Sequence, residues 1–150
     1  MNSSRTVPDD MAALLVMIEN HPPFTRLEPG VHGSGHARRV LLFSQLIASL
    51  IEAASDAAPV DRRLLLIASL LHDCGRRNNG IDPEHADRSA EMAVDFCRSH
   101  GILCDLIKLR DCIRYHCKSG CHPLRNPSIE ARILADADKL DRFRFHGSCA

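Results

Sequence analysis

Hydrophobic residues recur along the chain at steps of three and four, in stretches separated by short breaks rich in Pro and Gly. This is the period of an amphipathic α-helix, whereas runs that alternate apolar and polar residues, as strands do, are almost absent. The pattern predicts an all-α protein. We expect residues 1–150 to form a single-domain helical bundle of about six helices.

The first two predicted helices flank a loop. The first is expected from Asp10 to about Asn20, where "HPPF" ends it, and "TRLEPGVHGSG" has the Gly and Pro content of a connection. Ser34 is the expected N-cap of the second helix. The inward stripe of the second helix is expected to consist of His36, Val40, Phe43, Ile47 and Leu50.

The third predicted helix is the most hydrophobic segment. It is expected from near Pro59 to the Gly75 region, and "LLLIASLL" within it is apolar on all sides, which predicts a central, buried helix. The pair Asp82-Pro83 is typical of a helix cap and first turn. We therefore expect a fourth helix from this pair to about Ser99.

The last two predicted helices also place ionisable residues near the core. The fifth is expected from Cys104 to Cys117, and the sixth from about Ser128 onward. The expected stripe of the fifth is Leu106, Leu109, Ile113 and His116. That of the sixth is Ile133, Ala137 and Leu140, with Leu134 and Asp138 on an adjacent stripe, so Asp138 is expected at the edge of the core.

Ionisable groups thus converge on a predicted apolar interior. His72 and Asp73 end the most hydrophobic helix, and His36, His116 and Asp138 lie on or beside inward stripes. Burying such groups without partners costs several kcal/mol. One histidine on an apolar stripe is more often a hydrogen-bonded core residue, but a set of imidazoles and carboxylates suits a divalent ion such as iron, manganese, cobalt, nickel or zinc.

The same residues carry a resemblance to a known family. His36 in "HARRV", His72-Asp73 in "LLHDCGR" and Asp138 in "LADADKLD" resemble the signature of the HD-domain metal-dependent phosphohydrolase superfamily, over about residues 30–142. The resemblance implies an HD-type helical bundle in which these four residues bind one ion, with Mn, Fe, Ni, Co, Zn and Mg as the candidates. It also implies that Asp73 belongs to the catalytic centre and can bridge to a second ion.

Two further histidines fit the resemblance. His85 in "DPEHADRSA" and His116 in "IRYHC" are similar in position to residues that supply a second metal ion or contact substrate phosphate in other members. His116-Cys117 stands where the cyclic-dinucleotide members have paired histidines, and their Gly-Tyr-Pro element is absent from the sequence. These departures argue against a cyclic-dinucleotide enzyme.

The implied function is a divalent-metal-dependent phosphohydrolase with a metal-activated water as nucleophile. Its substrate is expected to be a small phosphoester, such as a nucleotide or a related phosphorylated metabolite. Arg76 and Arg77 are expected to clamp the phosphate, with Lys118 as a further cation, although the arginine pair equally fits a solvated turn. His85 or His116 is expected to protonate the leaving oxygen.

Two other functions remain open at the level of sequence. Similar bundles with a dinuclear iron site include oxygenases, and the six candidate ligands for two ions are present in this chain. The third interpretation is a non-catalytic regulatory module that binds a metal or nucleotide. Hydrolysis of a phosphoester by the metallated protein separates the first function from the other two.

Several nearby residues have simpler interpretations. "CKSGCHP" offers Cys117, Cys121 and His122, but a closed structural zinc site usually draws paired ligands from two segments, so we do not favour one here. His32 is expected in a loop at the rim of the site, and Cys74 as a small packed residue.

Arg38 and Arg39 are expected to have a structural role. This interpretation rests on the family pattern, in which a positive residue commonly stands just before the valine.

Composition limits the partners. The chain has 19 basic and 19 acidic residues, so its formal charge is +0, and no nucleic-acid-binding signature is present. Its apolar runs are far shorter than the ~20 residues that span a bilayer, so no membrane association is expected. The seven cysteines, an odd number without a recognisable secretory signal before them, are expected as reduced thiols in the cytoplasm. The expected partner is a small phosphorylated substrate, and a homodimer remains an open alternative.

Overall fold

The computed structural model describes residues 10–56, 59–117 and 126–146, and within them it contains helices and no strand. The helices are α1 (Met11–Glu19), α2 (Ser34–Ala54), α3 (Arg62–Leu71), α4 (His85–His100), α5 (Leu106–His116) and α6 (Ile129–His146), with a short 3-10 helix, η1 (Phe24–Arg26). The all-α prediction with six helices is confirmed.

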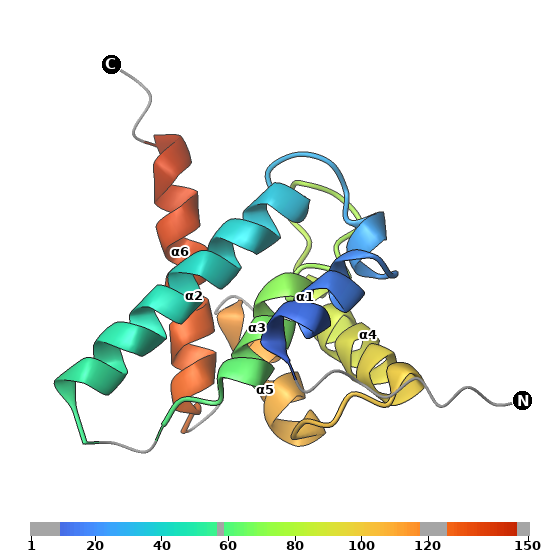
Figure 1. Ribbon diagram of the computed structural model, residues 1–150. Helices are drawn as coiled ribbons and strands as arrows, with labels where there is room; N and C mark the ends of the chain where they lie inside the picture. Colours follow the sequence, from blue (N-terminus) through green and yellow to red (C-terminus); the bar gives the residue numbers. More distant parts are fainter. Residues whose placement is uncertain (1–9, 57–58, 118–125, 147–150) are drawn as a thin grey trace, which may run out of the picture.

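Helix α3 is the centre of the bundle. Every residue from Leu64 to Leu71 is buried, and α3 contacts all five other α-helices, as its position in the middle of Figure 1 shows. Asp61 caps its N-terminus by accepting a hydrogen bond from the Leu64 N–H at 2.9 Å. The helix ends with His72 as C-cap, so the central helix delivers His72 and Asp73 into the interior.

Helix α2 crosses α6 and packs on α3 (Figure 1), and of its predicted inward stripe His36 and Val40 are buried and Phe43 and Ile47 pack against the core, but Leu50 does not. Val40, Ser44 and Ala48 are fully buried and lie four residues apart. Leu50 is two residues past Ala48, which turns it about 200° around the helix axis, and 62% of it is exposed. The prediction that Leu50 belongs to the inward stripe was therefore wrong.

Helix α6 shows a similar offset. Leu140 is 47% exposed, whereas Asp141 is fully buried. The inward row of α6 continues from Leu134 and Asp138 to Asp141, one residue beyond Leu140 and about 100° away from it around the axis. The carboxylate of Asp141 thus takes the inward position predicted for Leu140. Asp138 is 1% exposed, so it lies within the core and not at its edge, where it was predicted.

Most helix ends lie within a few residues of the ends that the sequence predicted. Asp10 caps α1 by accepting from the Ala12 N–H, and Gly101 ends α4 in the left-handed conformation, with φ of 65°. The N-cap of α2 is Gly33, not Ser34. Helix α4 begins at His85, three residues after the predicted cap, and its N-cap is Glu84.

Asp82 accepts from the Arg77 N–H at 3.0 Å and from the Arg88 guanidinium at 2.6 Å. It therefore ties the turn after α3 to the first turns of α4. This connection holds the Arg76–Gly80 loop over the start of α4.

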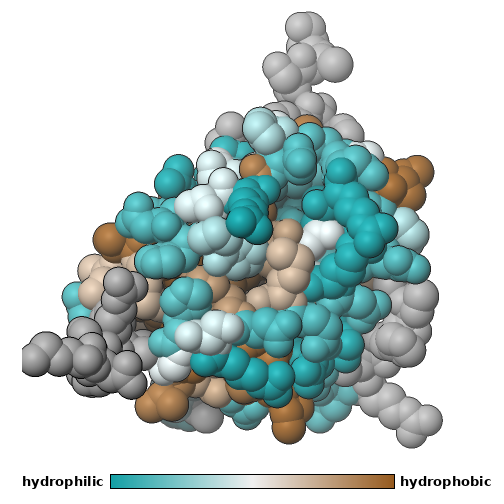
Figure 2. Space-filling view, turned by 90° about the vertical axis from the view of Figure 1, so that its right-hand side faces the viewer, coloured by the Kyte–Doolittle hydropathy of each residue, from teal (hydrophilic) through white to brown (hydrophobic). Residues whose placement is uncertain are grey.

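The outer surface carries both hydrophilic and apolar side chains. Figure 2 shows the side of the molecule at the right of Figure 1, where hydrophilic side chains cover most of the face and surround a hollow with more apolar colour. No helix of the described residues is long and apolar enough to cross a membrane.

Candidate metal centre

The ends of α2 and α3 bring two buried histidines together. His36 lies in the first turn of α2 and is 2% exposed, and His72 at the end of α3 is fully buried. Their Nε2 atoms are 3.2 Å apart.

Hydrogen bonds fix which nitrogen of each ring faces inward. The Nδ1 atom of His72 lies 2.8 Å from the Ser69 carbonyl oxygen, and Nδ1 of His36 lies 2.7 Å from Oδ2 of Asp141. A carbonyl or an ionised carboxylate can only accept, so we assign the proton to Nδ1 and the lone pair to Nε2 in both rings. Two lone pairs facing each other at 3.2 Å favour a cation between them.

Two carboxylates complete this group. Oδ1 of Asp138 lies 3.2 Å from Nε2 of His36 and 3.9 Å from Nε2 of His72. Oδ2 of Asp73 lies 3.6 Å from each of the same nitrogens. Within the described residues, Oδ1 of Asp73 and Oδ1 of Asp138 are buried without a hydrogen-bond partner. Buried anionic oxygens left in this way are costly unless a cation neutralises them.

The spacing of these four side chains fits a metal ion. Nitrogen and oxygen ligands about 2.1 Å from one ion, at the angles of tetrahedral or octahedral geometry, lie about 3.0–3.4 Å apart. The observed separations of 3.2 to 3.9 Å require only small side-chain movements to reach that spacing. Imidazole nitrogens and carboxylate oxygens are also a donor set that borderline divalent ions accept.

The charge states of three of the four residues agree with this interpretation, whereas His36, in spite of its burial, has its pKa raised above the ordinary value by Asp138 and Asp141, so an ion would displace its proton. Burial lowers the pKa of His72 to about 4, so its ring is neutral near neutral pH. Burial alone would raise the pKa of Asp73 and of Asp138, but His72 and His116 beside Asp73, and His36 beside Asp138, hold both below their ordinary values. Neutral imidazoles and ionised carboxylates are the forms that bind metals.

A second group lies on the other side of Asp73. His85 begins α4 and His116 ends α5, and their Nε2 atoms are 3.4 Å apart. Oδ1 of Asp73 lies 3.3 Å from the first and 3.5 Å from the second. The Nδ1 atoms contact the main-chain carbonyls of Asp82 and Ile113, so these two Nε2 atoms also carry lone pairs that face inward.

The family follows from comparison with known proteins. A family model described as "HD domain" matches residues 33–142, which include both groups of candidate ligands. The chain belongs to the HD-domain family. Members of this family are generally divalent-metal-dependent hydrolases. No curated protein and no solved structure was found that matches the chain.

The two arginines that follow the His-Asp pair occupy different places in this HD domain. The Arg76 side chain is 8% exposed, and its Nε lies 3.0 Å from Oδ1 of Asp73. Its Nη2 lies 3.3 Å from Nε2 of His85. Arg77 is exposed, and its main-chain N–H donates to Asp82. The structure thus brings Arg76, but not Arg77, to the metal centre.

The sequence interpretation missed the buried carboxylate that supports His36. Asp141 accepts from His36 Nδ1 and, on its other side, from Arg39 Nε at 2.6 Å and Nη2 at 3.0 Å. Arg39 was expected to be structural, and it is bound to a residue that orients a candidate ligand. The available signal was the spacing, since Asp141 follows Asp138 by three residues and so shares its helix face.

Three side chains that contact the carboxylates reach the surface. His32, expected at the rim, has Nδ1 2.8 Å from Oδ2 of Asp73 and is 12% exposed. Arg142 has Nη2 2.7 Å from Oδ2 of Asp138 and is 46% exposed, and Arg76 is the third. An anionic ligand therefore meets the guanidinium groups of Arg76 and Arg142 as it approaches the centre.

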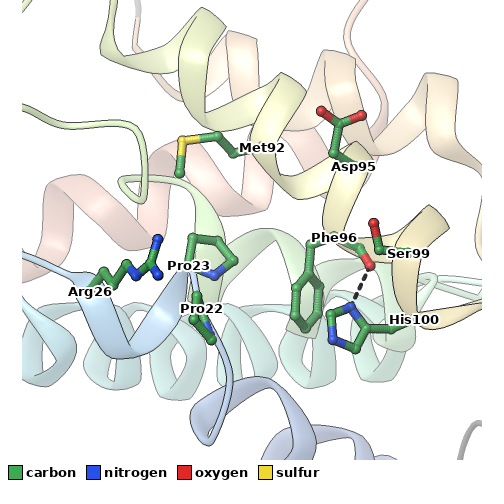
Figure 3. A pocket seen from close by; sticks show the side chains of 8 residues that line it. All are labelled: Pro22, Pro23, Arg26, Met92, Asp95, Phe96, Ser99 and His100. Atoms are coloured by element: carbon green, nitrogen blue, oxygen red, sulfur yellow. Dashed lines mark hydrogen bonds between the residues drawn. The ribbon is translucent and has the colours of Figure 1, made fainter.

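A hollow lies elsewhere, between residues 22–26 and α4 (Figure 3). Its volume is about 300 Å³, and Pro22, Pro23, Phe96 and His100 contribute much of its wall. None of the candidate metal ligands lines it. The hollow is mainly apolar, so we place the chemistry of the protein at the His-Asp cluster.

Cys74, next to the His-Asp pair, packs against α4. Burial raises the pKa of the Cys74 thiol to about 12, and its Sγ contacts the Ser89 carbonyl, which describes an inert packed residue. Cys117 lies at the end of α5. Lys118, Cys121 and His122 lie outside the described residues.

Proposed function

We propose that this HD domain is a divalent-metal-dependent phosphohydrolase that cleaves a small phosphoester, such as a nucleotide or a related phosphorylated metabolite. One observation carries the proposal. The Nε2 atoms of His36 and His72 converge with carboxylate oxygens of Asp73 and Asp138 at separations of 3.2 to 3.9 Å. The general activity of the family supports the reaction class.

These four residues would hold the ion, for which Mn, Fe, Ni, Co, Zn and Mg are the candidates. A divalent ion in such a centre lowers the pKa of water and stabilises negative charge on phosphoryl oxygens. The protein supplies the ligands in the required protonation states and keeps them in place from several helices. Asp141 and the Ser69 carbonyl hold the two imidazoles in position.

Arginine side chains would bind the substrate phosphate. A guanidinium presents a planar set of donors that matches phosphate oxygens and stays protonated. Arg76 and Arg142 lie against Asp73 and Asp138, the two candidate carboxylate ligands. Positive charge held there in advance stabilises the charge that develops as the phosphoester bond breaks.

His85 and His116 are the proposed groups for proton transfer to the leaving oxygen. Each Nε2 atom faces the interior of the centre, and in its protonated form such a nitrogen donates a proton. Burial lowers the pKa of His85, so its neutral form predominates near neutral pH. Protonation of the leaving group through His85 is accordingly expected to weaken as the pH rises.

The substrate is expected to present its phosphate end to a narrow opening. His32 and Arg76 are 12% and 8% exposed, and the four proposed metal ligands are almost completely buried. The remainder of the substrate would lie outside, near the exposed Arg77. The odd number of cysteines is the basis on which we propose the cytoplasm as the compartment.

The test is a substrate panel on protein reconstituted separately with each candidate metal. Phosphomonoesters, phosphodiesters and nucleoside triphosphates are incubated with the protein, and phosphate or product release is measured. We expect hydrolysis of at least one class, and a loss of at least about 100-fold for His72→Ala and Asp138→Asn. Asp136→Asn is the matched control, because Asp136 is on α6 and is 66% exposed.

Three results would overturn the proposal. The first is a fully metallated protein that hydrolyses nothing in the panel. The second is a His72→Ala variant in which only nucleotide binding changes, which indicates a regulatory module. The third is consumption of oxygen by the iron-loaded protein with an organic substrate, which indicates the oxygenase alternative.

A further inference from the structure

The two oxygens of Asp73 serve different parts of the centre. Oδ2 lies 3.6 Å from Nε2 of both His36 and His72. Oδ1 lies 3.3 Å from Nε2 of His85 and 3.5 Å from Nε2 of His116. Asp73 therefore contributes one oxygen to the proposed metal site and the other to a second group of candidate ligand atoms, here called the second compartment.

The second compartment has the dimensions of a metal site. The atoms Asp73 Oδ1, His85 Nε2 and His116 Nε2 are separated by 3.3, 3.5 and 3.4 Å. Three ligands on one face of a divalent ion have about the same spacing, 3.0–3.4 Å. Both imidazoles are fixed by contacts of Nδ1 with main-chain carbonyls, so the lone pairs converge without a change of tautomer.

A side chain of the protein already brings a cation to this triangle. Arg76 has Nε 3.0 Å from Asp73 Oδ1 and Nη2 3.3 Å from His85 Nε2, so it contacts two of the three atoms. Its Nη1 donates to the Gly80 carbonyl at 3.2 Å, which anchors the far side of the guanidinium. The side chain is 8% exposed, so little solvent screens its charge.

We propose that the guanidinium of Arg76 takes the place of a second metal ion, so that this HD domain holds one ion and keeps its second site closed. The inference rests on the proposed function, because it assumes that the first site binds metal. Two physical effects close the site. The permanent charge of Arg76 repels a divalent ion at short range, and the Nη2–H group engages the His85 lone pair that such an ion needs.

A consequence concerns substrate binding. A second ion would bring its own coordination sites to the phosphate, whereas Arg76 offers N–H donors in one plane. The protein then recognises the phosphate with one metal ion and the guanidinium of Arg76. Removing Arg76 should therefore change the number of bound ions and not only the rate of the reaction.

Metal stoichiometry tests the proposal without reference to activity. Each protein is saturated with Mn²⁺, freed of loosely bound ion and analysed for metal per chain, and its electron paramagnetic resonance spectrum is recorded. We expect one ion in the wild type and in Arg76→Lys, which keeps a cation. We expect Arg76→Ala to hold two ions, a twofold rise, with the spectrum of a magnetically coupled pair.

Further variants identify the site of the added ion. Arg76→Ala combined with His116→Ala should return to one ion per chain, because one corner of the triangle is lost. Arg98→Ala is the control for removal of an arginine, since Arg98 lies on α4 and is 60% exposed. Arg76→Gln serves as a bulkier neutral replacement if Arg76→Ala does not fold, as judged by circular dichroism.

The outcomes separate this inference from the function on which it rests. A folded wild type that binds no ion would overturn the proposed function. A wild type that binds two ions, or folded Arg76→Ala and Arg76→Gln variants that still bind one, would overturn the role of Arg76 and leave the hydrolase proposal standing.

Discussion

Oδ2 of Asp141 lies 2.7 Å from Nδ1 of His36, on the side of the imidazole opposite the proposed metal. Arg39 donates two hydrogen bonds to the same carboxylate, which is fully buried. A carboxylate in this position fixes the ring and makes its other nitrogen a stronger ligand. The chain Arg39–Asp141–His36 thus connects α2 and α6 behind the metal centre.

Replacing Asp141 by Asn should weaken metal binding by about 10–100-fold, because the amide lacks the charge that polarises His36. The measurement is a competition titration against a chelator of known affinity. Asp136→Asn, on the exposed face of the same helix, should leave the affinity unchanged. Equal affinities for Asp141→Asn and the wild type would contradict the proposed role of this carboxylate.

Removal of the metal should lower thermal stability. The buried carboxylates of Asp73 and Asp138 each contact one arginine, Arg76 and Arg142, so without the ion their negative charge near the core is only partly compensated. Free metal at 100 times its dissociation constant stabilises the folded state by about 2.7 kcal/mol. Thermal unfolding with metal and after complete chelation measures the difference. An identical midpoint in the two conditions would count against a metal at this site.

Gly75→Ala should destabilise the protein and disturb the metal centre. A Cβ at this position would lie 2.5 Å from the Ser89 nitrogen and 2.8 Å from two atoms of Arg88, so the loop after α3 and helix α4 must separate. We expect a loss of about 1–3 kcal/mol in the free energy of unfolding, measured by urea denaturation.

Gly80→Ala is the matched control in the same loop. A Cβ added at this position would lie 3.4 Å from the Asn78 side chain, which is ordinary van der Waals contact. We expect this substitution to have little effect on stability. Equal stability of the Gly75 and Gly80 variants would show that α4 does not need to approach the loop closely.

Glu130 should contribute a pH-dependent part of the stability. Its carboxylate accepts from the Asp61 N–H at 2.9 Å and contacts Lys108 Nζ at 2.9 Å, joining the starts of α6, α3 and α5. Burial by itself would raise the pKa of Glu130, but these two partners hold it below its ordinary value of 4.5. Because the folded pKa is the lower one, this stabilisation is present above pH 4.5 and is lost as the pH falls through the folded pKa.

Glu130→Gln should lower the free energy of unfolding by about 1–3 kcal/mol at neutral pH. This loss should become smaller as the pH falls below 4.5. Urea denaturation over a pH series gives both quantities. Glu84→Gln, at a side chain that is 78% exposed, is the control. A cost for Glu130→Gln that stays constant with pH would exclude the ionised carboxylate as its source.

Much of the bundle was predictable because helix signals are local. The apolar run from Leu64 to Leu71 predicted a central helix, and Gly101 ended α4 near the expected residue. The rotation of a helix is harder to predict, as Leu50 and Leu140 show. A helix with apolar residues on more than one side can bury either row, and its neighbours select which one is buried.

The sequence by itself determined the helical class, the family resemblance and the identity of the candidate ligands, because spacing along a helix decides which side chains share a face. Only the tertiary structure showed that Asp141 supports His36, and that of two adjacent arginines Arg76 enters the centre while Arg77 remains outside. These relationships join residues that are far apart in the chain or lie in a loop without periodicity. They depend on how α2, α4 and α6 pack around α3, which no local pattern specifies.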